Sequence, residues 1–246
     1  MLSVVQTELL KIKRQKMILG ICGILVLFWA GLTFWTYHIP RTDSQMDNFS
    51  DFYTRYGSYL SILLAFIIGL LFIKSYSGEY RNDTLKELLQ VPISMNTVFA
   101  SKVLFVLILA IVIMALNCLL VLLGAFICSF PDITLSNSID LVREFFLIGL
   151  LFPFALFPVF LAAVISKGNT VFSSTFNFAY ILSGLAGLEP FAGIHPISSL
   201  FSLLFNKQIA FGVDFKEQLI YAGNIFLGAI FIGIIVVFYY SLNREK

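Results

Sequence analysis

The chain has 246 residues, of which 59% are apolar and only 12% are charged, and its formal net charge is +2. Soluble domains carry about 25% charged residues, so this composition excludes an ordinary soluble or nucleic-acid-binding domain and predicts an all-α integral membrane protein. No polar segment is long enough for a second domain, so residues 1–246 are expected to form a single transmembrane domain.

Residues 1–16 have the pattern of an amphipathic helix at the membrane surface. One helical stripe carries Met1, Leu2, Val5, Leu9 and Ile12, and four basic residues close the segment. Such a basic end suits contact with anionic headgroups. A secretory signal peptide is the alternative, but the apolar run at 17–37 is too long for one and no small-residue cleavage site follows it. We therefore expect an interfacial helix and an uncleaved first span.

Six apolar runs are long enough to cross a membrane at about 20 residues per crossing. They cover approximately residues 17–37, 56–74, 98–129, 144–165, 171–188 and 218–241. The third run is the longest, and at about 1.5 Å per residue it should tilt or extend past the headgroups. Pro153 and Pro158 predict a kink in the fourth.

Lys and Arg are distributed unevenly between the flanks of these spans, which indicates the orientation. With the N-terminus inside, the inner segments hold eleven of the 16 basic residues and the outer segments hold five. The inner group is Lys11, Lys13, Arg14, Lys16, Lys74, Arg81, Lys86, Lys102, Lys167, Arg244 and Lys246. Because basic residues are enriched on the cytoplasmic side, both termini and the segment between spans two and three are expected to be cytoplasmic.

The two longest outer segments differ in character. Residues 38–55 contain three aspartates and two arginines and are predicted to form a solvated loop. Residues 184–217 contain helix-breaking glycines and prolines, yet residues 197–205 are mostly apolar. Nine such residues cannot cross a bilayer, and irregular backbone cannot face lipid. We therefore expect a short re-entrant or interfacial hairpin between spans five and six.

The stretch Glu79–Ser94 is the longest polar interruption in the first half of the chain, and it contains a helix pattern. Thr84 and Glu87 can form a capping box, and Pro92 ends the run. One helical face carries three leucines, Leu85, Leu88 and Leu89. A helix of two turns is too short to be stable alone, so another surface must bury these leucines. That surface is either the lipid or the bundle itself, or a cytosolic partner on which the helix docks.

The chain lacks the residues that would supply energy to transport. No predicted span has an ionisable side chain near its middle, so coupling to a proton or ion gradient is not expected. The sequence also lacks the G-x-x-x-x-G-K-[ST] loop, so ATP would have to be bound in that manner by another chain. Energy, if it is used, should therefore enter from a partner.

Metal and catalytic sites are not predicted either. His38 and His195 have no metal-ligand spacing around them, and Ser173 and Ser174 have no base at membrane depth. The three cysteines are expected to be small buried side chains. The polar residues that stand out at depth are Asn117, Asn177 and Asn224. They are expected either to hydrogen-bond between helices or to contact a translocated molecule.

Together these features resemble the permease subunits of type-2 ATP-binding-cassette (ABC) exporters. The most specific matches are Glu79, Thr-Leu-Lys-Glu-Leu-Leu at 84–89, Pro-Ile-Ser at 92–94 and Lys102 at the head of span three. Asp83 stands where many members have Gly, and Met95 where many have a basic residue. Within this superfamily, the length, the short loops and the Phe/Ile/Leu-rich spans are most similar to lantibiotic-protection (immunity) permeases of Gram-positive bacteria.

The resemblance implies a multi-pass permease of the bacterial cell membrane that binds no cofactor itself. Its partners would be a separate ATPase subunit, which uses ATP and Mg²⁺, and a second permease chain, identical or different. The ATPase-docking residues would be Glu79, Thr84, Leu85, Lys86, Glu87, Leu88, Leu89 and Pro92. The cargo would be a lantibiotic or similar membrane-active peptide. Export of another antibiotic, a lipid or a polysaccharide is the alternative, and a non-transport assembly factor is a third.

Overall fold

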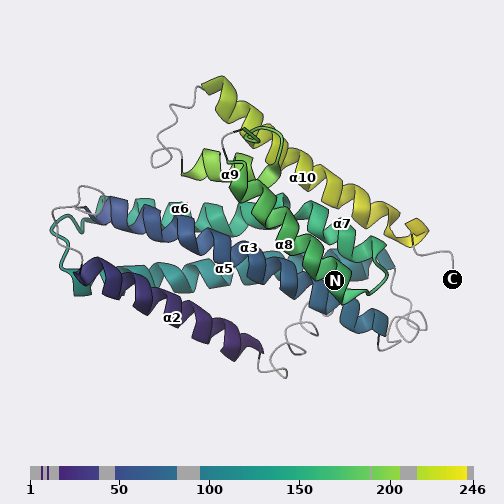
Figure 1. The fold of residues 1–246 in the computed structure, drawn as a ribbon, viewed down its shortest axis with the longest axis horizontal. Helices are drawn as coiled ribbons and strands as arrows, with labels where there is room; N and C mark the ends of the chain where they lie inside the picture. Colours follow the sequence, from purple (N-terminus) through teal and green to yellow (C-terminus); the bar gives the residue numbers. More distant parts are fainter. Residues whose placement is uncertain are drawn as a thin grey trace.

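The computed structural model describes residues 7, 10, 17–38, 48–81, 95–188, 190–205 and 215–242. Its elements in chain order are α2 (Met17–His38), α3 (Phe49–Arg81), α5 (Met95–Cys128), α6 (Leu135–Ala155), α7 (Phe157–Ile165), α8 (Thr170–Ala186), α9 (Pro196–Leu204) and α10 (Phe215–Leu242). The helices α3, α5 and α6 lie together along the long axis, with α2 on one flank and α10 on the other (Figure 1).

Five described segments are long and apolar enough to cross a membrane: Ile18–His38, Phe49–Gly78, Asn96–Cys128, Leu135–Ile165 and Lys216–Val236. They correspond to five of the six predicted spans. The counterpart of the remaining one, α8, has 17 residues and is shorter than these five. An all-helical multi-pass membrane protein is therefore confirmed, whereas the number of six spans stays a prediction.

The second span is longer than predicted at both ends. It was expected at 56–74, but α3 already begins at Phe49, so the prediction of an outer loop up to residue 55 is wrong for its described part. Phe49, Phe52 and Tyr53 are all buried, so the first turns have an apolar face. Neighbouring charged residues lower the average hydropathy of this stretch, so the sequence did not indicate a span here. The carboxylate of Asp132, between α5 and α6, accepts the Phe49 N–H at 2.8 and 3.0 Å and so caps the helix.

The fourth span also begins earlier than its predicted start at residue 144. Thr134 caps α6, because its hydroxyl oxygen accepts the Asn137 N–H at 3.3 Å. The predicted kink is confirmed, since the helix is interrupted at Leu156, with Pro153 on one side and Pro158 on the other. The first and third spans differ from their predicted limits by no more than a few residues.

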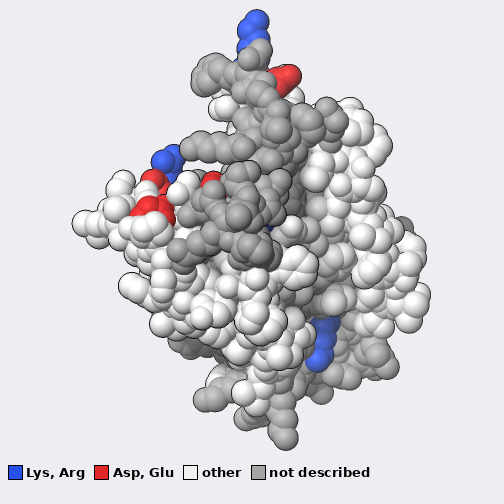
Figure 2. Space-filling model, turned by 60° about the vertical axis from the view of Figure 1, so that its left-hand side comes forward, with Lys and Arg blue, Asp and Glu red and all other residues white. Residues whose placement is uncertain are grey.

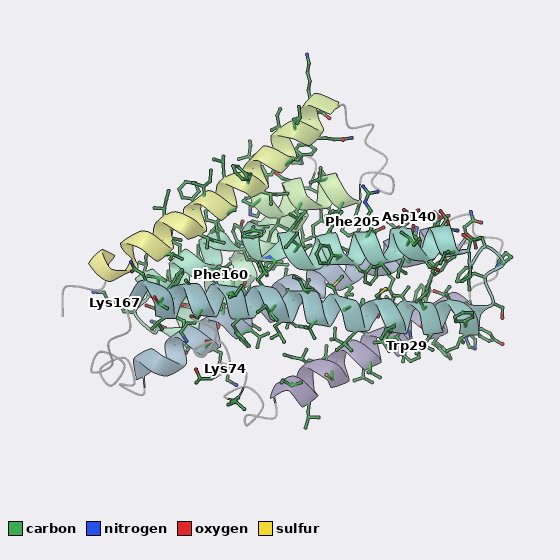
Figure 3. All side chains as sticks on the ribbon, turned by 180° about the vertical axis from the view of Figure 1, so that it is seen from behind. Trp29, Lys74, Asp140, Phe160, Lys167 and Phe205 are labelled. Atoms are coloured by element: carbon green, nitrogen blue, oxygen red, sulfur yellow. The ribbon has the colours of Figure 1, made fainter. Side chains whose placement is uncertain are left out.

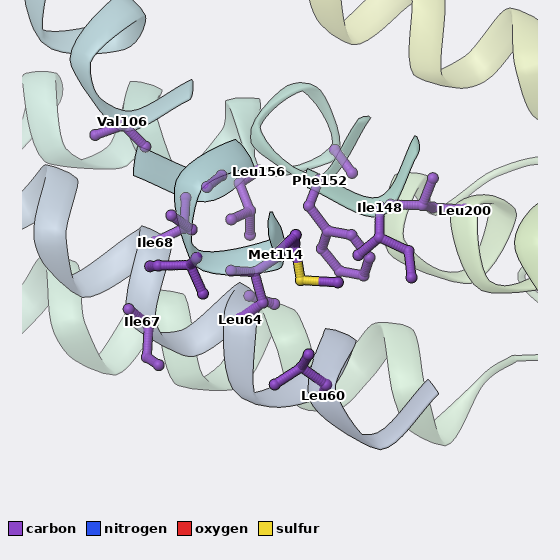
Figure 4. Close-up of a cluster of buried hydrophobic side chains, with 14 of the residues drawn as sticks. Leu60, Leu64, Ile67, Ile68, Val106, Met114, Ile148, Phe152, Leu156 and Leu200 are labelled. Atoms are coloured by element: carbon purple, nitrogen blue, oxygen red, sulfur yellow. The ribbon is translucent and has the colours of Figure 1, made fainter. Parts of the chain in front are cut away.

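The core is an apolar cluster between α3, α5, α6 and α9 (Figure 4). Its labelled members are buried: Leu60, Leu64, Ile67, Ile68, Val106, Met114, Ile148, Phe152, Leu156 and Leu200. By contrast, only 17% of the apolar window in α2 and 22% of that in α10 is buried inside the structure. Most of the described surface seen in Figure 2 is uncharged, with acidic and basic side chains in small groups. Such a surface suits contact with lipid or with another membrane helix.

Candidate transport and coupling site

The predicted docking residues lie almost entirely outside the described residues. Residues 82–94 contain all of them except Glu79, whose backbone belongs to the last turn of α3. In the predicted interfacial helix, only Thr7 and Leu10 are described, and both are helical. The docking contact therefore stays a prediction. The structure does define the two helices that residues 82–94 join, α3 and α5.

Lys102 holds these two helices together close to that junction. Its side chain is only 2% exposed, and its ammonium group donates to the Ser75 carbonyl oxygen at 3.2 Å and to the Ser75 hydroxyl at 3.1 Å. An ammonium group removed from water needs such acceptors. Among the side chains that the structure describes, Lys102 is the only buried charged one. Its place is therefore set by α3, although it belongs to α5.

An aromatic cluster surrounds the same contact. The Phe72 ring stacks on that of Phe160 with centroids 4.1 Å apart, and it meets the Phe99 ring edge-on at 5.8 Å. Tyr76 stacks next to Phe72 on α3 at 6.3 Å. Offset and edge-on pairs of this kind stabilise more than their buried area alone. Three helices, α3, α5 and α7, are thus packed together at the level of Lys102.

Asn117 makes a second polar contact between α3 and α5. The Tyr56 hydroxyl donates to its side-chain oxygen at 3.2 Å, and its amide donates to the Ile113 carbonyl oxygen of its own helix at 2.8 Å. Both side chains are buried. Asn117 was expected either to hydrogen-bond between helices or to contact a translocated molecule, and this contact fits the first interpretation.

Asn177 has a different environment, at the contact between α8 and α3. The side chain is 1% exposed, and its oxygen has no hydrogen-bond partner among the described residues. It lies so close to Gly69 that any side chain at that position would collide with it. Phe66 and Phe178 pack beside it, with ring centroids 5.1 Å apart. The α3–α8 contact therefore depends on packing around an amide oxygen that has no hydrogen-bond partner among the described residues.

Asn224 joins α10 to α9. Its amide donates to the Ser199 hydroxyl at 2.9 Å, and this hydroxyl in turn donates to the His195 carbonyl oxygen at 3.0 Å. His195 caps α9, since its Nδ1 accepts the Ile197 N–H at 3.2 Å. The His195 ring also stacks on Tyr180 of α8, with centroids 4.5 Å apart, so the start of α9 is fixed against α8.

The three asparagines therefore lie in three different helix contacts. Asn117 is opposite Tyr56 and Asn177 is opposite Gly69, positions that are separated on α3 by about 20 Å of helix. Asn224 is on α10, next to α9. The structure of this single chain does not bring the three together. No group of His, Cys, Asp and Glu that could hold a metal ion occurs among the described residues.

A family model described as "ABC-2 family transporter protein" matches residues 4–184, which is well over half of the chain. The chain belongs to the ABC-2 transporter family. It is thus a permease of an ABC exporter and a multi-pass protein of the cell membrane. The family implies a separate ABC ATPase as partner, and its members typically have no ATPase site of their own. No curated protein and no solved structure matches the chain significantly. The matched region ends within α8, so α9 and α10 lie beyond it.

Proposed function

We propose that this chain is the permease through which an ATP-driven exporter expels a lantibiotic or a similar membrane-active peptide, and thereby protects the cell that carries it. The observation that carries the transport part is the family match over residues 4–184. The cargo is inferred from the short loops and the Phe-, Ile- and Leu-rich spans, which resemble immunity permeases.

The polar groups of the structure favour energy from a partner over energy from an ion gradient. Lys102, the only charged residue that is buried as a whole among those described, is bound to Ser75 near the end of α3 and does not lie at the middle of a span. A proton or ion relay needs ionisable groups at membrane depth. The apolar, aromatic surface also suits a cargo that enters sideways from the lipid.

The arrangement of α8 and α9 supports six crossings with both termini in the cytosol. α8 begins beside Lys167, which lies toward the same end of the bundle as Lys74 (Figure 3). Phe205, directly after α9, lies further toward the Asp140 end. At about 1.5 Å per residue, α8 covers roughly 25 Å, and α9 begins beside its last turns, where His195 stacks on Tyr180 and the Ser198 hydroxyl donates to the Gly184 carbonyl oxygen. In this proposal α8 makes the fifth crossing, with α9 packed at its outer end, and α10 makes the sixth.

ATP would act through the docking helix proposed at residues 84–92. Leu85, Leu88 and Leu89 would enter a groove on the ATPase subunit, with Lys86 and Glu87 at the polar edge. ATP and Mg²⁺ would be bound by that subunit, and closure of two such subunits would displace the helix. Because residues 82–94 connect α3 directly to α5, the displacement would pass into both helices.

Docking is tested by the double variant Leu85→Asp and Leu88→Asp in the full chain, expressed together with the ATPase subunit. We expect loss of co-purification with unchanged membrane insertion. Gln90→Asp is the matched control, because helical spacing places residue 90 on the face opposite the leucines. An intact complex in the double variant would show that this helix does not dock on the ATPase.

The cargo is tested in cells that produce the complete transporter. These cells are challenged with a panel of lantibiotics, and cells with the Leu85→Asp and Leu88→Asp permease serve as the control. We expect protection against at least one lantibiotic that disappears in the control. Unchanged killing across the panel would remove the immunity function. Protection against a different antibiotic would then identify another cargo for the same permease.

A further inference from the structure

We propose that Lys102 is a positioning residue that makes α3 and α5 move as one rigid pair when the segment between them is displaced. The inference rests on the proposed function, because it concerns how force from an ATPase subunit would spread through the bundle. It goes beyond that function by naming the contact that decides which helices move together.

The first reason is the position of the two polar contacts along the pair. Lys102 binds Ser75, and Tyr56 binds Asn117, so α3 and α5 are hydrogen-bonded at two levels. These levels are separated on α3 by roughly 30 Å of helix, which is about the thickness of the hydrocarbon core. A single contact would leave the pair free to pivot, whereas two distant contacts fix its crossing angle.

The second reason is the contrast with the α3–α8 contact. No hydrogen bond joins α3 to α8 among the described residues, and the Asn177 oxygen faces Gly69 without a partner. A buried amide oxygen without a hydrogen bond destabilises the arrangement it is in. Sliding of α3 against α8 therefore breaks no hydrogen bond, while separation of α3 from α5 breaks several.

The third reason is the chemistry of the Lys102 site. The Ser75 hydroxyl and carbonyl are neutral acceptors. Replacement of Lys102 by Met, an apolar side chain of similar length, removes the ammonium group that binds both of them and leaves the Tyr56–Asn117 hydrogen bond in place. The substitution thus removes the hydrogen bonds at this level while it changes the volume of the side chain little.

The test uses the full chain in complex with its ATPase subunit and follows distances between spin labels. The native cysteines Cys22, Cys118 and Cys128 are first replaced by alanine. Labels are then placed at the exposed positions Leu70 on α3 and Ile108 on α5, or at Leu70 and Val171 on α8. Distances are compared before and after addition of ATP with vanadate.

With the native lysine, we expect the α3–α8 distance to change by roughly 2 Å or more, the scale of helix shifts in switching proteins, and the α3–α5 distance to stay constant. In Lys102→Met, the α3–α5 distance should change as well. Lys102→Arg should restore the constant distance, and Ser75→Ala, which removes one of the two acceptors, should give a smaller change. Lys74→Met is the matched control, because Lys74 is an exposed lysine adjacent to Ser75.

Each outcome has a defined meaning. A constant α3–α5 distance in Lys102→Met, or a changing one in the unaltered permease, would overturn the role of Lys102 while leaving the exporter function intact. Absence of any complex between the unaltered chain and an ATPase would instead overturn the proposed function itself. Thermal stability of every variant complex is measured in parallel, and Ser75→Ala decides the question if Lys102→Met does not assemble.

Discussion

The hydrogen bond between Tyr56 and Asn117 allows a quantitative test of how α3 is held to α5. Tyr56→Phe removes the donor and changes almost no volume. The Asn117 oxygen then loses the hydroxyl at 3.2 Å, while its amide keeps the Ile113 carbonyl at 2.8 Å. Interhelical hydrogen bonds in membranes contribute about 0.6 kcal/mol on average and up to about 1.7 kcal/mol. Because both side chains are buried, we expect Tyr56→Phe to lower the free energy of unfolding by about 1–2 kcal/mol.

A double-mutant cycle combines Tyr56→Phe with a second variant, Asn117→Leu. This second variant leaves the Tyr56 hydroxyl buried without its Asn117 partner. We expect a loss of similar size. The double variant leaves neither group unpaired, so its loss should be smaller than the sum of the two by about 1 kcal/mol. This difference, rather than either single loss, reports the hydrogen bond.

Unfolding can be followed in detergent with a thiol-reactive dye, because Cys118 and Cys128 are buried thiols outside any disulfide and react only once the bundle opens. Cys118 is adjacent to Asn117, so a Cys118→Ala background, which leaves Cys128 as the buried reporter, controls for local effects. Losses that add without any difference would refute the reasoning, since they would show that the two side chains are not energetically coupled.

Three further predictions follow from other contacts. Gly228→Ala should destabilise the protein by about 1–3 kcal/mol in the same dye assay, because the new methyl group would lie 2.5 Å from a backbone oxygen of α6, whereas Gly233→Ala has open space around it and should be neutral or stabilising. Gly69→Ala should likewise destabilise the protein, because the new methyl group would collide with the Asn177 side chain. Adding Asn177→Ala should recover most of the lost stability. If it does not, the destabilisation does not come from this collision. His195→Ala should destabilise the protein by about 0.5–2 kcal/mol in the dye assay, because it removes the side chain that caps Ile197, whereas His195→Asn keeps a capping side chain and should lose less.

The sequence was sufficient for the apolar helices because length and composition alone identify them. The helix ends were less predictable, and α3 shows why. Its first turns carry Asp51 and Arg55 between buried aromatic residues, so average hydropathy falls although one face remains apolar. Its cap, Asp132, lies far along the chain, and no local pattern connects it to Phe49.

The polar contacts of the site were only partly predictable. Asn117, Asn177 and Asn224 were identifiable as polar residues at depth, but their partners, Tyr56, Gly69 and Ser199, depend on which helices pack together. Lys102 was recognisable only as part of a family pattern, and its burial against Ser75 is a tertiary property. The cap of α9 did have a local signal, a polar residue before Pro196 and an apolar run.

The segment α9 shows how this fold keeps a short helix within an apolar bundle. All its residues from Pro196 to Ser202 are buried, and three of them are serines that could not face lipid unpaired. The Ser198 hydroxyl donates to the Gly184 carbonyl oxygen of α8, and the Ser199 hydroxyl accepts from Asn224 of α10. These hydrogen bonds link α9 to both α8 and α10. If α3 and α5 move as a pair, we therefore expect them to slide against α8, because no hydrogen bond joins α3 to α8 among the described residues.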